Sequence, residues 1–291
     1  METIVLRHGP LSFTALAYGP AEGPVVLLLH GFPDTPQTFA SQLEVLAAAG
    51  YRAIAPTMRG YEPSSQPDDH DYRVGTMARD VLAWLDDLEV EHAHLVGHDW
   101  GAAVTFVAGA LAPERFQSLT AMAVPHAPRM MAACWSVPAQ LLNTWYMSFF
   151  QLPWLAEWAI ERNDWAMLKW LSSKWSPGFH FSPEEWEARR RTFEATGVKR
   201  AMLAYYRQNV SIGVLLGLVP SEMFSLRTVP VRTLAISGVN DGCMDTRLFD
   251  KVFLDEDFPC GHQLLRIEEA GHFMHLDAPE AVNRALLDWL K

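Results

Sequence analysis

The chain alternates between solid runs of apolar residues and segments whose apolar residues recur at helical spacing. A solid run indicates a strand buried on both faces of a parallel sheet, because a half-exposed strand would alternate apolar with polar residues. Segments 39–50 and 76–90 carry apolar residues three or four positions apart, which predicts helices between the strands. This order gives an α/β fold with helices on both faces of the sheet. The leading runs lie at residues 24–34, 52–60, 94–101 and 118–126.

The middle of the chain breaks this pattern. Residues 128–224 predict helices, hold no buried-strand run and are dense in tryptophan. We therefore expect a core domain formed by 1–127 and 225–291, interrupted by a helical lid at 128–224 that lies over the sheet and the active site. The other core elements expected are strands at 2–8, 11–19, 231–238 and 262–272 and a last helix at 279–291.

Composition excludes several classes of function. Hydrophobic residues make up 49% and charged residues 20% of the chain, which are proportions of a folded globular protein rather than a disordered one. The formal net charge of -11 disfavours a nucleic-acid partner, whose phosphates would be repelled. No run of Lys or Arg marks a membrane-surface patch, and no apolar stretch is long enough to predict a transmembrane helix, so no membrane partner is expected.

The N-terminal segment and the cysteines favour a cytoplasmic protein. Residues 1–13 lack the long apolar core of a signal peptide. The three cysteines, Cys134, Cys243 and Cys260, are scattered and odd in number, so they form neither a disulfide framework nor a metal-binding spacing. We expect each to be a free thiol that packs as a small buried apolar side chain.

The segment Gly97-His98-Asp99-Trp100-Gly101 is the strongest chemical signal. It follows an apolar run and opens a helical segment, which is the form of the nucleophile elbow G-x-S-x-G with Asp in place of Ser. Glycines suit such a turn because side chains there would clash where backbone segments come close. The turn would project Asp99 above the sheet edge and place the Trp100 N–H at a helix N-terminus, where negative charge is favoured. The alternative is an Asp that only caps the helix.

A second signal is the segment His30-Gly31-Phe32-Pro33-Asp34, directly after an apolar run. In folds built around such an elbow, this loop donates the second N–H of the oxyanion hole, and the Phe32 N–H is the candidate here. Pro33 lacks an N–H, stiffens the loop and is a candidate for a cis peptide bond. We expect Phe32, Pro33 and Trp100 to bind the substrate, and His30 to hold the loop by hydrogen bonds rather than act in catalysis.

Two loops late in the chain supply a candidate base and a candidate acid. His272 follows the last predicted strand, where the chain order of nucleophile, acid and histidine places the base, and His275 is the less favoured alternative. Asp241 lies in the loop after the preceding strand and can accept the His272 N–H, which fixes its tautomer and stabilises the imidazolium. Asp245 lies in the same loop and competes with Asp241, which we favour because it is nearer the strand end.

Together these motifs resemble the α/β-hydrolase superfamily, in its epoxide hydrolase and haloalkane dehalogenase branch. The resemblance covers nearly the whole chain and implies a mostly parallel eight-stranded sheet with helices on both faces and an inserted helical lid. The chain reads HGFPD where epoxide hydrolases often read HGFPE, a mild departure that leaves the backbone role of the loop unchanged. The motifs are HGFPD at 30–34, RGY at 59–61, GHDWGA at 97–102, GVNDG at 238–242 and AGHFMHLDAPE at 270–280.

An Asp nucleophile changes the chemistry that the elbow supports. A carboxylate is already ionised at neutral pH and needs no base before it attacks. Attack on an acyl carbon would give a labile anhydride-like species, whereas attack on a saturated carbon gives an ordinary ester, so epoxides and alkyl halides are the expected substrates. His272 would then activate the water that cleaves the ester, with the Phe32 and Trp100 N–H groups holding the oxyanion.

The leaving group separates these two substrates. Epoxide opening creates an alkoxide that needs a proton donor, and the resemblance implies that lid tyrosines supply the proton. Tyr206 in AYYRQN and Tyr146 in YMSFFQ are similar to the two lid tyrosines of epoxide hydrolases. Tyr205 and Tyr206 lie about 100° apart on a helix, so only one can face Asp99, and the arginine that follows selects Tyr206.

We therefore expect an epoxide hydrolase that converts a small apolar epoxide and water into a vicinal diol, with no cofactor and no metal. A haloalkane dehalogenase with the same triad is the alternative. Dehalogenases resemble the chain at Trp100, although one branch has Asn in place of Phe32 and another uses a lid Trp. A non-catalytic binding protein on this fold is less favoured because it would not need the triad. The sequence leaves a monomer and a homodimer both open. The catalytic residues expected are Asp99, His272, Asp241, Tyr146 and Tyr206.

Overall fold

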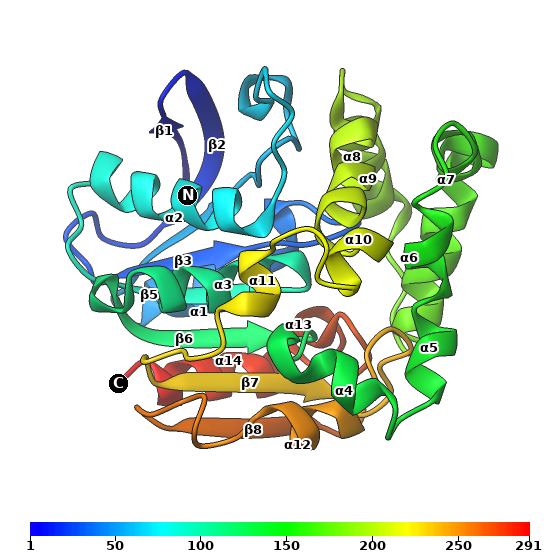
Figure 1. The fold of residues 1–291 in the computed structure, drawn as a ribbon. Helices are drawn as coiled ribbons and strands as arrows, with labels where there is room; N and C mark the ends of the chain where they lie inside the picture. The colour runs from blue at the N-terminus through cyan, green and yellow to red at the C-terminus, as the bar shows by residue number, and fades with distance from the viewer.

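The structure, a computed structural model, describes residues 1–291. Its eight strands form one sheet in the order β1-β2-β4-β3-β5-β6-β7-β8 (Figure 1). β2 runs antiparallel to its neighbours β1 and β4, and the remaining neighbours pair in parallel. The mostly parallel eight-stranded sheet expected from the sequence is confirmed. The strands are β1 (Glu2–His8), β2 (Leu11–Tyr18), β3 (Val25–Leu29), β4 (Arg52–Pro56), β5 (Ala93–His98), β6 (Phe116–Met122), β7 (Thr233–Gly238) and β8 (His262–Ile267).

Helices cover both faces of the sheet. In β3, Val26 joins an apolar cluster with α1 and α14 on one face, whereas Leu27 joins the larger cluster with α2 and α3 on the other. All of β3 is buried, which explains its solid apolar run, since neither face can carry polar residues at low cost. The helices of this core are α1 (Ala40–Ala48), α2 (Val74–Asp87), α3 (Trp100–Leu111), α12 (Phe249–Val252), α13 (Met274–Asp277) and α14 (Pro279–Trp289).

The stretch interpreted from the sequence as a lid contains helices and no strand. Most of these helices lie beyond the carboxyl ends of the parallel strands, where the arrowheads of β6 and β7 point in Figure 1, whereas α11 lies beside α2 and α3. The longest, α7, is kinked at residues 162–165, where the backbone leaves helical geometry. No helix of the chain combines the length and apolar character needed to cross a membrane. The helices of this stretch are α4 (Met130–Cys134), α5 (Ala139–Asn143), α6 (Trp145–Phe149), α7 (Leu155–Trp175), α8 (Pro183–Glu194), α9 (Val198–Asn209), α10 (Ile212–Leu215) and α11 (Glu222–Ser225).

The turn from β5 into α3 depends on two glycines. A Cβ at Gly101 would lie 2.1 Å from the carbonyl oxygen of Leu29, and a Cβ at Gly97 would lie 2.2 Å from the carbonyl oxygen of Gly101. Both obstacles are backbone atoms, so a side chain at Gly101 would push α3 away from β3, and a side chain at Gly97 would push α3 away from β5. Glycine therefore lets α3 begin directly against the sheet.

Gly101→Ala should lower the free energy of unfolding by about 3 kcal/mol, because the added methyl group must displace the backbone of β3. Gly178→Ala is the matched control, since a Cβ at Gly178 would meet no atom within 4 Å. Urea unfolding of the two variants measures the difference. A Gly101→Ala variant within about 0.5 kcal/mol of the control would contradict the close approach of α3 to β3.

Candidate active site

Asp99 lies at the bend between β5 and α3 in an uncommon backbone conformation. Its φ of 53° and ψ of -117° lie outside the regions that residues with side chains favour. Although Asp99 occupies the N-cap position of α3, its side chain accepts no capping hydrogen bond from the helix. The carboxylate, only 5% exposed, is therefore held for contacts other than helix capping.

The loop after β3 fixes one oxygen of this carboxylate. The Phe32 N–H donates a hydrogen bond of 2.7 Å to Asp99 Oδ1. A Cβ at Gly31 would lie 2.4 Å from the same oxygen, so glycine is needed for the loop to come this close. His30 shapes the loop, because its Nδ1 donates to the Gly31 carbonyl at 3.0 Å and its Nε2 accepts a backbone N–H at 3.1 Å. The Phe32–Pro33 peptide bond is cis.

His272 connects Asp99 to a second carboxylate. Its Nε2 lies 3.5 Å from Asp99 Oδ2, and its Nδ1 donates a hydrogen bond of 2.9 Å to Asp241 Oδ2. Burial opposes the charged imidazolium, but the neighbouring negative charge, Asp241 foremost, outweighs burial and raises the pKa of His272 well above its usual value. Asp245 instead pairs with the Arg247 guanidinium. The structure thus brings Asp99, His272 and Asp241 together and leaves Asp245 outside the group.

Backbone and lid groups orient Asp241. Its Oδ1 accepts the Cys243 N–H at 2.6 Å and the next N–H along the chain at 2.9 Å, which leaves Oδ2 for His272. Gln140 on α5 steadies this loop, because its side chain donates to the Cys243 carbonyl and accepts the Asp245 N–H, both at 2.8 Å. A side chain of α5 thereby helps to position Asp241, a role that the sequence did not indicate.

The end of helix α7 contacts both the loop that holds Asp241 and the loop that holds His272. The Trp175 carbonyl accepts the N–H of His272 at 2.9 Å and the N–H of Gly242 at 3.1 Å. A Cβ at Gly242 would lie 2.1 Å from a carbonyl oxygen of α7, and a Cβ at Gly271 would lie 2.6 Å from the Trp175 carbonyl oxygen. The sequence did not indicate this role for Trp175, although the two loop glycines are a signal that another backbone approaches there.

Tyr146 on α6 and Tyr206 on α9 turn into the site, with ring centroids 5.7 Å apart. The Tyr206 hydroxyl has no hydrogen-bond partner, and the Tyr146 hydroxyl bonds only to Cys243 Sγ at 3.3 Å. Burial raises the pKa of both phenols well above the usual value, so both stay protonated at neutral pH. Tyr205 points elsewhere, because its hydroxyl donates to the Arg59 carbonyl at 2.6 Å.

A small apolar cavity of about 30 Å³ lies between Asp99 and the lid helices, and Asp99 is its sole charged lining residue. A polar ligand would find few partners there, so the cavity suits an apolar molecule. Phe32, Pro33 and Tyr146 are not among the lining residues, although the Phe32 ring packs on Tyr206 at 5.1 Å between centroids. The cavity is lined by Asp99, Trp100, Ala103, Val124, Met130, Met147, Tyr206, Val210, Met223 and Met244.

The cysteines are free, but they do not all pack as the sequence predicted. Cys134 and Cys243 are buried, whereas Cys260 is exposed, so the expectation of a buried side chain was wrong for Cys260. Cys260 lies in the surface turn that precedes β8, where little covers it. Cys243 lies in the site itself, within 4.8 Å of the ligand atoms of Asp241 and His272. Because Cys243 forms no motif with the other cysteines, its position in the site could not be predicted from the sequence.

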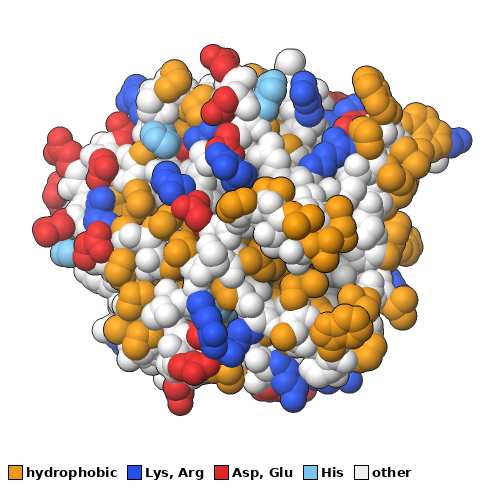
Figure 2. All heavy atoms as spheres, in the orientation of Figure 1, with side chains coloured by type: hydrophobic (Ala, Val, Ile, Leu, Met, Phe, Trp, Pro, Cys, Tyr) orange, Lys and Arg blue, Asp and Glu red, His pale blue; other side chains and the backbone are white.

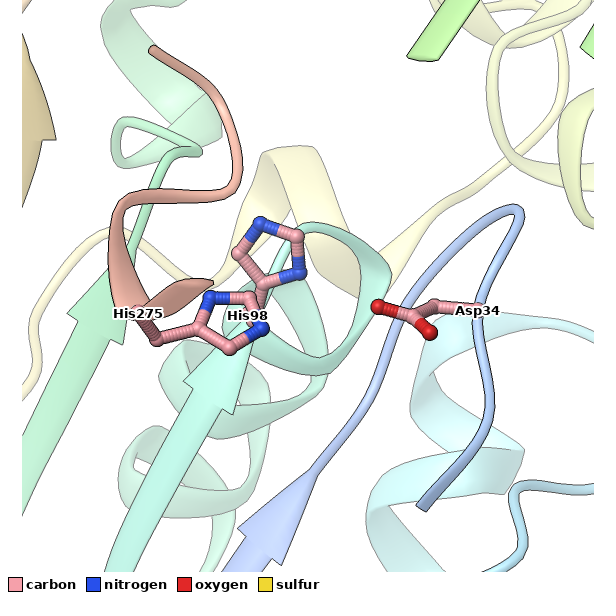
Figure 3. A group of neighbouring side chains, drawn as sticks. All are labelled: Asp34, His98 and His275. Carbon is pink, nitrogen blue, oxygen red and sulfur yellow. The ribbon is translucent and has the colours of Figure 1, made fainter. Parts of the chain in front are cut away.

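Asp34, His98 and His275 form a second buried cluster, with Asp34 facing the two imidazole rings (Figure 3). One polar atom of each lies within 4.8 Å of the others, a spacing that a metal ion can bridge. The Arg189 guanidinium pairs with Asp34 at 2.9 Å, however, and would repel a second positive charge there. His98 instead helps to position His272, because its Nε2 donates to the His272 carbonyl at 2.9 Å.

Comparison with known proteins agrees with this fold. The family model described as alpha/beta hydrolase fold matches residues 24–279, so the chain belongs to the α/β-hydrolase family, as the motifs predicted. It is similar to the AB hydrolase superfamily protein YfhM of Bacillus subtilis, with 33% identity over 277 residues that cover 94% of this chain and 93% of the relative.

Two further proteins similar to the chain bear the name epoxide hydrolase. Human epoxide hydrolase 4 is 29% identical over 294 residues, which cover 98% of this chain and 77% of the relative. A solved structure of an epoxide hydrolase from an endophytic Streptomyces has a TM-score of 0.80 and 26% identity, and the match covers 99% of this chain and 95% of that one.

Proposed function

We propose that this chain is an epoxide hydrolase that converts a small apolar epoxide into a vicinal diol through an ester on Asp99. The observation that carries the proposal is a buried carboxylate that shares an apolar site with buried, protonated tyrosine hydroxyls. The carboxylate attacks saturated carbon without prior activation, and the phenols supply the proton that an opening epoxide ring requires. The names of the similar proteins from human and Streptomyces support the same reaction.

In the first step, Asp99 Oδ2 attacks an epoxide carbon and the ring carbon–oxygen bond breaks. Oδ1 remains on the Phe32 N–H, which keeps the carboxylate oriented. The Tyr146 and Tyr206 hydroxyls bind the epoxide oxygen, and one of them transfers its proton to the departing alkoxide. The product of this step is an ester between Asp99 and the alcohol.

In the second step, a water molecule loses a proton to His272 Nε2 and attacks the carbonyl carbon of the Asp99 ester. Oδ1 becomes the oxyanion, held by the N–H groups of Phe32 and Trp100. The ester bond then breaks, and the proton on His272 passes to the oxygen of the departing diol. The new carboxyl group of Asp99 ionises, and its proton restores the tyrosine.

The charge of Asp99 links the two steps. Burial disfavours the imidazolium, yet the charge of Asp241 and the nearby Asp99 carboxylate keep the pKa of His272 raised while Asp99 is ionised. Formation of the ester removes the charge on Asp99, so the pKa of His272 falls. Completion of the first step therefore shifts His272 toward the neutral form that the second step needs.

A haloalkane dehalogenase is the second candidate, and one observation favours it. Trp100 Nε1 is buried without a hydrogen-bond partner and lines the same cavity as Asp99, where an indole N–H can bind a halide leaving group. The other requirements are shared, since attack by Asp99 and ester hydrolysis by His272 are the same in both reactions.

Incubation with styrene oxide and with 1-bromobutane, followed by assays for diol and bromide, tests the proposal. Diol formation without bromide release is the expected result, and Asp99→Ala should abolish it. Bromide release without diol would replace the proposal with the dehalogenase. Diol formation that survives in Asp99→Ala would show that the reaction does not proceed through this carboxylate.

Asp241→Asn should lower the rate of ester hydrolysis by about 100-fold, because the amide holds the His272 imidazole less firmly and stabilises its cation less. Asp245→Asn is the matched control, since Asp245 lies in the same loop but pairs with Arg247. We expect its turnover to stay within about twofold of wild type. Single-turnover kinetics with styrene oxide distinguishes the variants, and equal losses in both would refute the assignment of Asp241.

A further inference from the structure

The lid carries an unusually apolar outer surface. From Met130 to Ala156 the chain has no charged residue, yet many of its large side chains are open to solvent. Trp135 is 83% exposed and Trp154 is 86% exposed. Figure 2 shows hydrophobic side chains gathered over α5, α6 and the start of α7, on the right-hand side of the view. We name this surface the lid patch and define it by Trp135, Leu141, Leu142, Trp145, Leu152 and Trp154.

The lid patch exceeds what a surface without a partner usually shows. Side chains of this size and exposure present on the order of 1,000 Å² of apolar surface. The largest apolar patch of a typical monomer is about 300–600 Å². A standard protein interface buries about 800 Å² on each partner. The lid patch is thus large enough to be one side of a stable interface.

We propose that the lid patch is a homodimer interface, occupied by the lid patch of a second copy of this chain. In a contact with twofold symmetry, residues near the axis meet their own copies, so a charged residue there would face its like charge. The uncharged stretch from Met130 to Ala156 avoids that repulsion. Each copy carries a formal net charge of -11, so an apolar face without charges is where two copies can approach at least cost.

The same charges argue against a lipid surface as the occupant. Peripheral membrane helices combine apolar side chains with Lys and Arg that attract anionic headgroups. The stretch from Met130 to Ala156 contains neither residue, and the chain as a whole is acidic. Tryptophan is also among the residues that contribute most to protein interfaces, since it buries a large rigid ring at low entropic cost.

The interface would lie behind the active site, and it does not depend on the reaction proposed above. In α6, Trp145 is exposed on the outer side, whereas the adjacent Tyr146 is 1% exposed and faces the site. A second copy would therefore cover the helix that carries Tyr146 without touching the cavity.

Sedimentation velocity of the wild-type chain at about 1 to 100 μM tests the proposal, and we expect a dimer that dominates at the upper end. Trp135→Ser combined with Trp154→Ser should raise the dimer dissociation constant at least 100-fold. Val5→Ser combined with Leu254→Ser is the matched control, because both residues are exposed apolar side chains outside the lid. Circular dichroism and thermal melting establish that each variant is folded.

Varying the salt concentration gives an independent test of the proposed dimer. Raising NaCl from about 0.05 to 0.5 M should tighten the dimer, because salt screens the repulsion between acidic copies and leaves apolar contacts intact. A wild-type chain that stays monomeric throughout, or a lid variant that dimerises as well as its control, would overturn the proposal. So would a dimer that salt dissociates, or a wild-type monomer that co-sediments with phosphatidylcholine vesicles through Trp135 and Trp154.

Discussion

His272→Gln should accumulate a covalent ester on Asp99 when it is mixed with styrene oxide. Ring opening needs only the carboxylate and the tyrosines, whereas water attack needs the His272 imidazole, whose Nε2 lies 3.5 Å from Asp99 Oδ2 and has no hydrogen-bond partner. Glutamine fills a similar volume but cannot accept the proton of water. We expect ester hydrolysis to slow by roughly 10³-fold, so that one full turnover leaves nearly every molecule esterified.

Intact-mass spectrometry measures this result as a gain of one styrene oxide per chain, and peptide mapping should place the adduct on Asp99. His275→Gln is the control, because His275 lies three residues along but hydrogen bonds to Thr38 rather than to the nucleophile. That variant should turn over without a lasting adduct. Continued consumption of epoxide by His272→Gln with no adduct would exclude the two-step mechanism, and an adduct on Cys243 would reassign the nucleophile.

The positions of Asp99, Phe32 and His272 in the site could be predicted from the sequence. Asp99 and Phe32 each lie just beyond the end of a strand with a solid apolar run, and His272 follows the last strand, where the chain order of nucleophile, acid and histidine places the base. The parallel strands of a sheet end at a common edge, so residues that follow them meet in space. Backbone chemistry reinforced the prediction, since Gly97, Gly101 and Gly31 each stand where another backbone or carboxylate comes within 2.4 Å of a Cβ position. These local requirements for glycine can be recognised from the sequence alone.

The choice between Asp241 and Asp245 shows where this reasoning weakens. Both are loop carboxylates after β7, and only their distance from the strand end favoured Asp241. The structure adds the physical reason, because two backbone N–H groups hold Asp241 Oδ1 while Asp245 pairs with Arg247 and accepts the Arg247 N–H. A difference of four residues in one loop changes partners without changing any periodic pattern.

The sequence could not assign the contacts that support the triad to particular residues of the helical stretch. The Trp175 carbonyl accepts the His272 N–H, and Gln140 holds the loop of Asp241, although each pair is about a hundred residues apart in the chain. A backbone carbonyl has no side-chain identity to recognise, and a polar residue in an amphipathic lid looks like any solvent-facing residue. Contacts of this kind depend on how the lid docks, which apolar patterns do not specify.

Tyr146→Phe combined with Tyr206→Phe should slow the opening of the epoxide by roughly 10³-fold or more, since the alkoxide would then leave without a proton donor. Both phenols are buried, and phenylalanine keeps their packing, so the fold should survive. Each single variant should lose less, because the remaining hydroxyl still binds the oxygen. Tyr205→Phe is the control, because the Tyr205 hydroxyl donates its hydrogen bond to the Arg59 carbonyl.

Stopped-flow tryptophan fluorescence or quenched-flow mass analysis of ester formation separates this step from ester hydrolysis. The double variant should form the Asp99 ester slowly and then hydrolyse it at the normal rate, because His272 and Asp241 are untouched. This pattern is the reverse of that expected for His272→Gln, so the two variants together assign one half-reaction to the lid and the other to the core. Near-normal ester formation in the double variant would remove both tyrosines from the mechanism, and bromide release that persists while diol formation fails would favour the dehalogenase reaction.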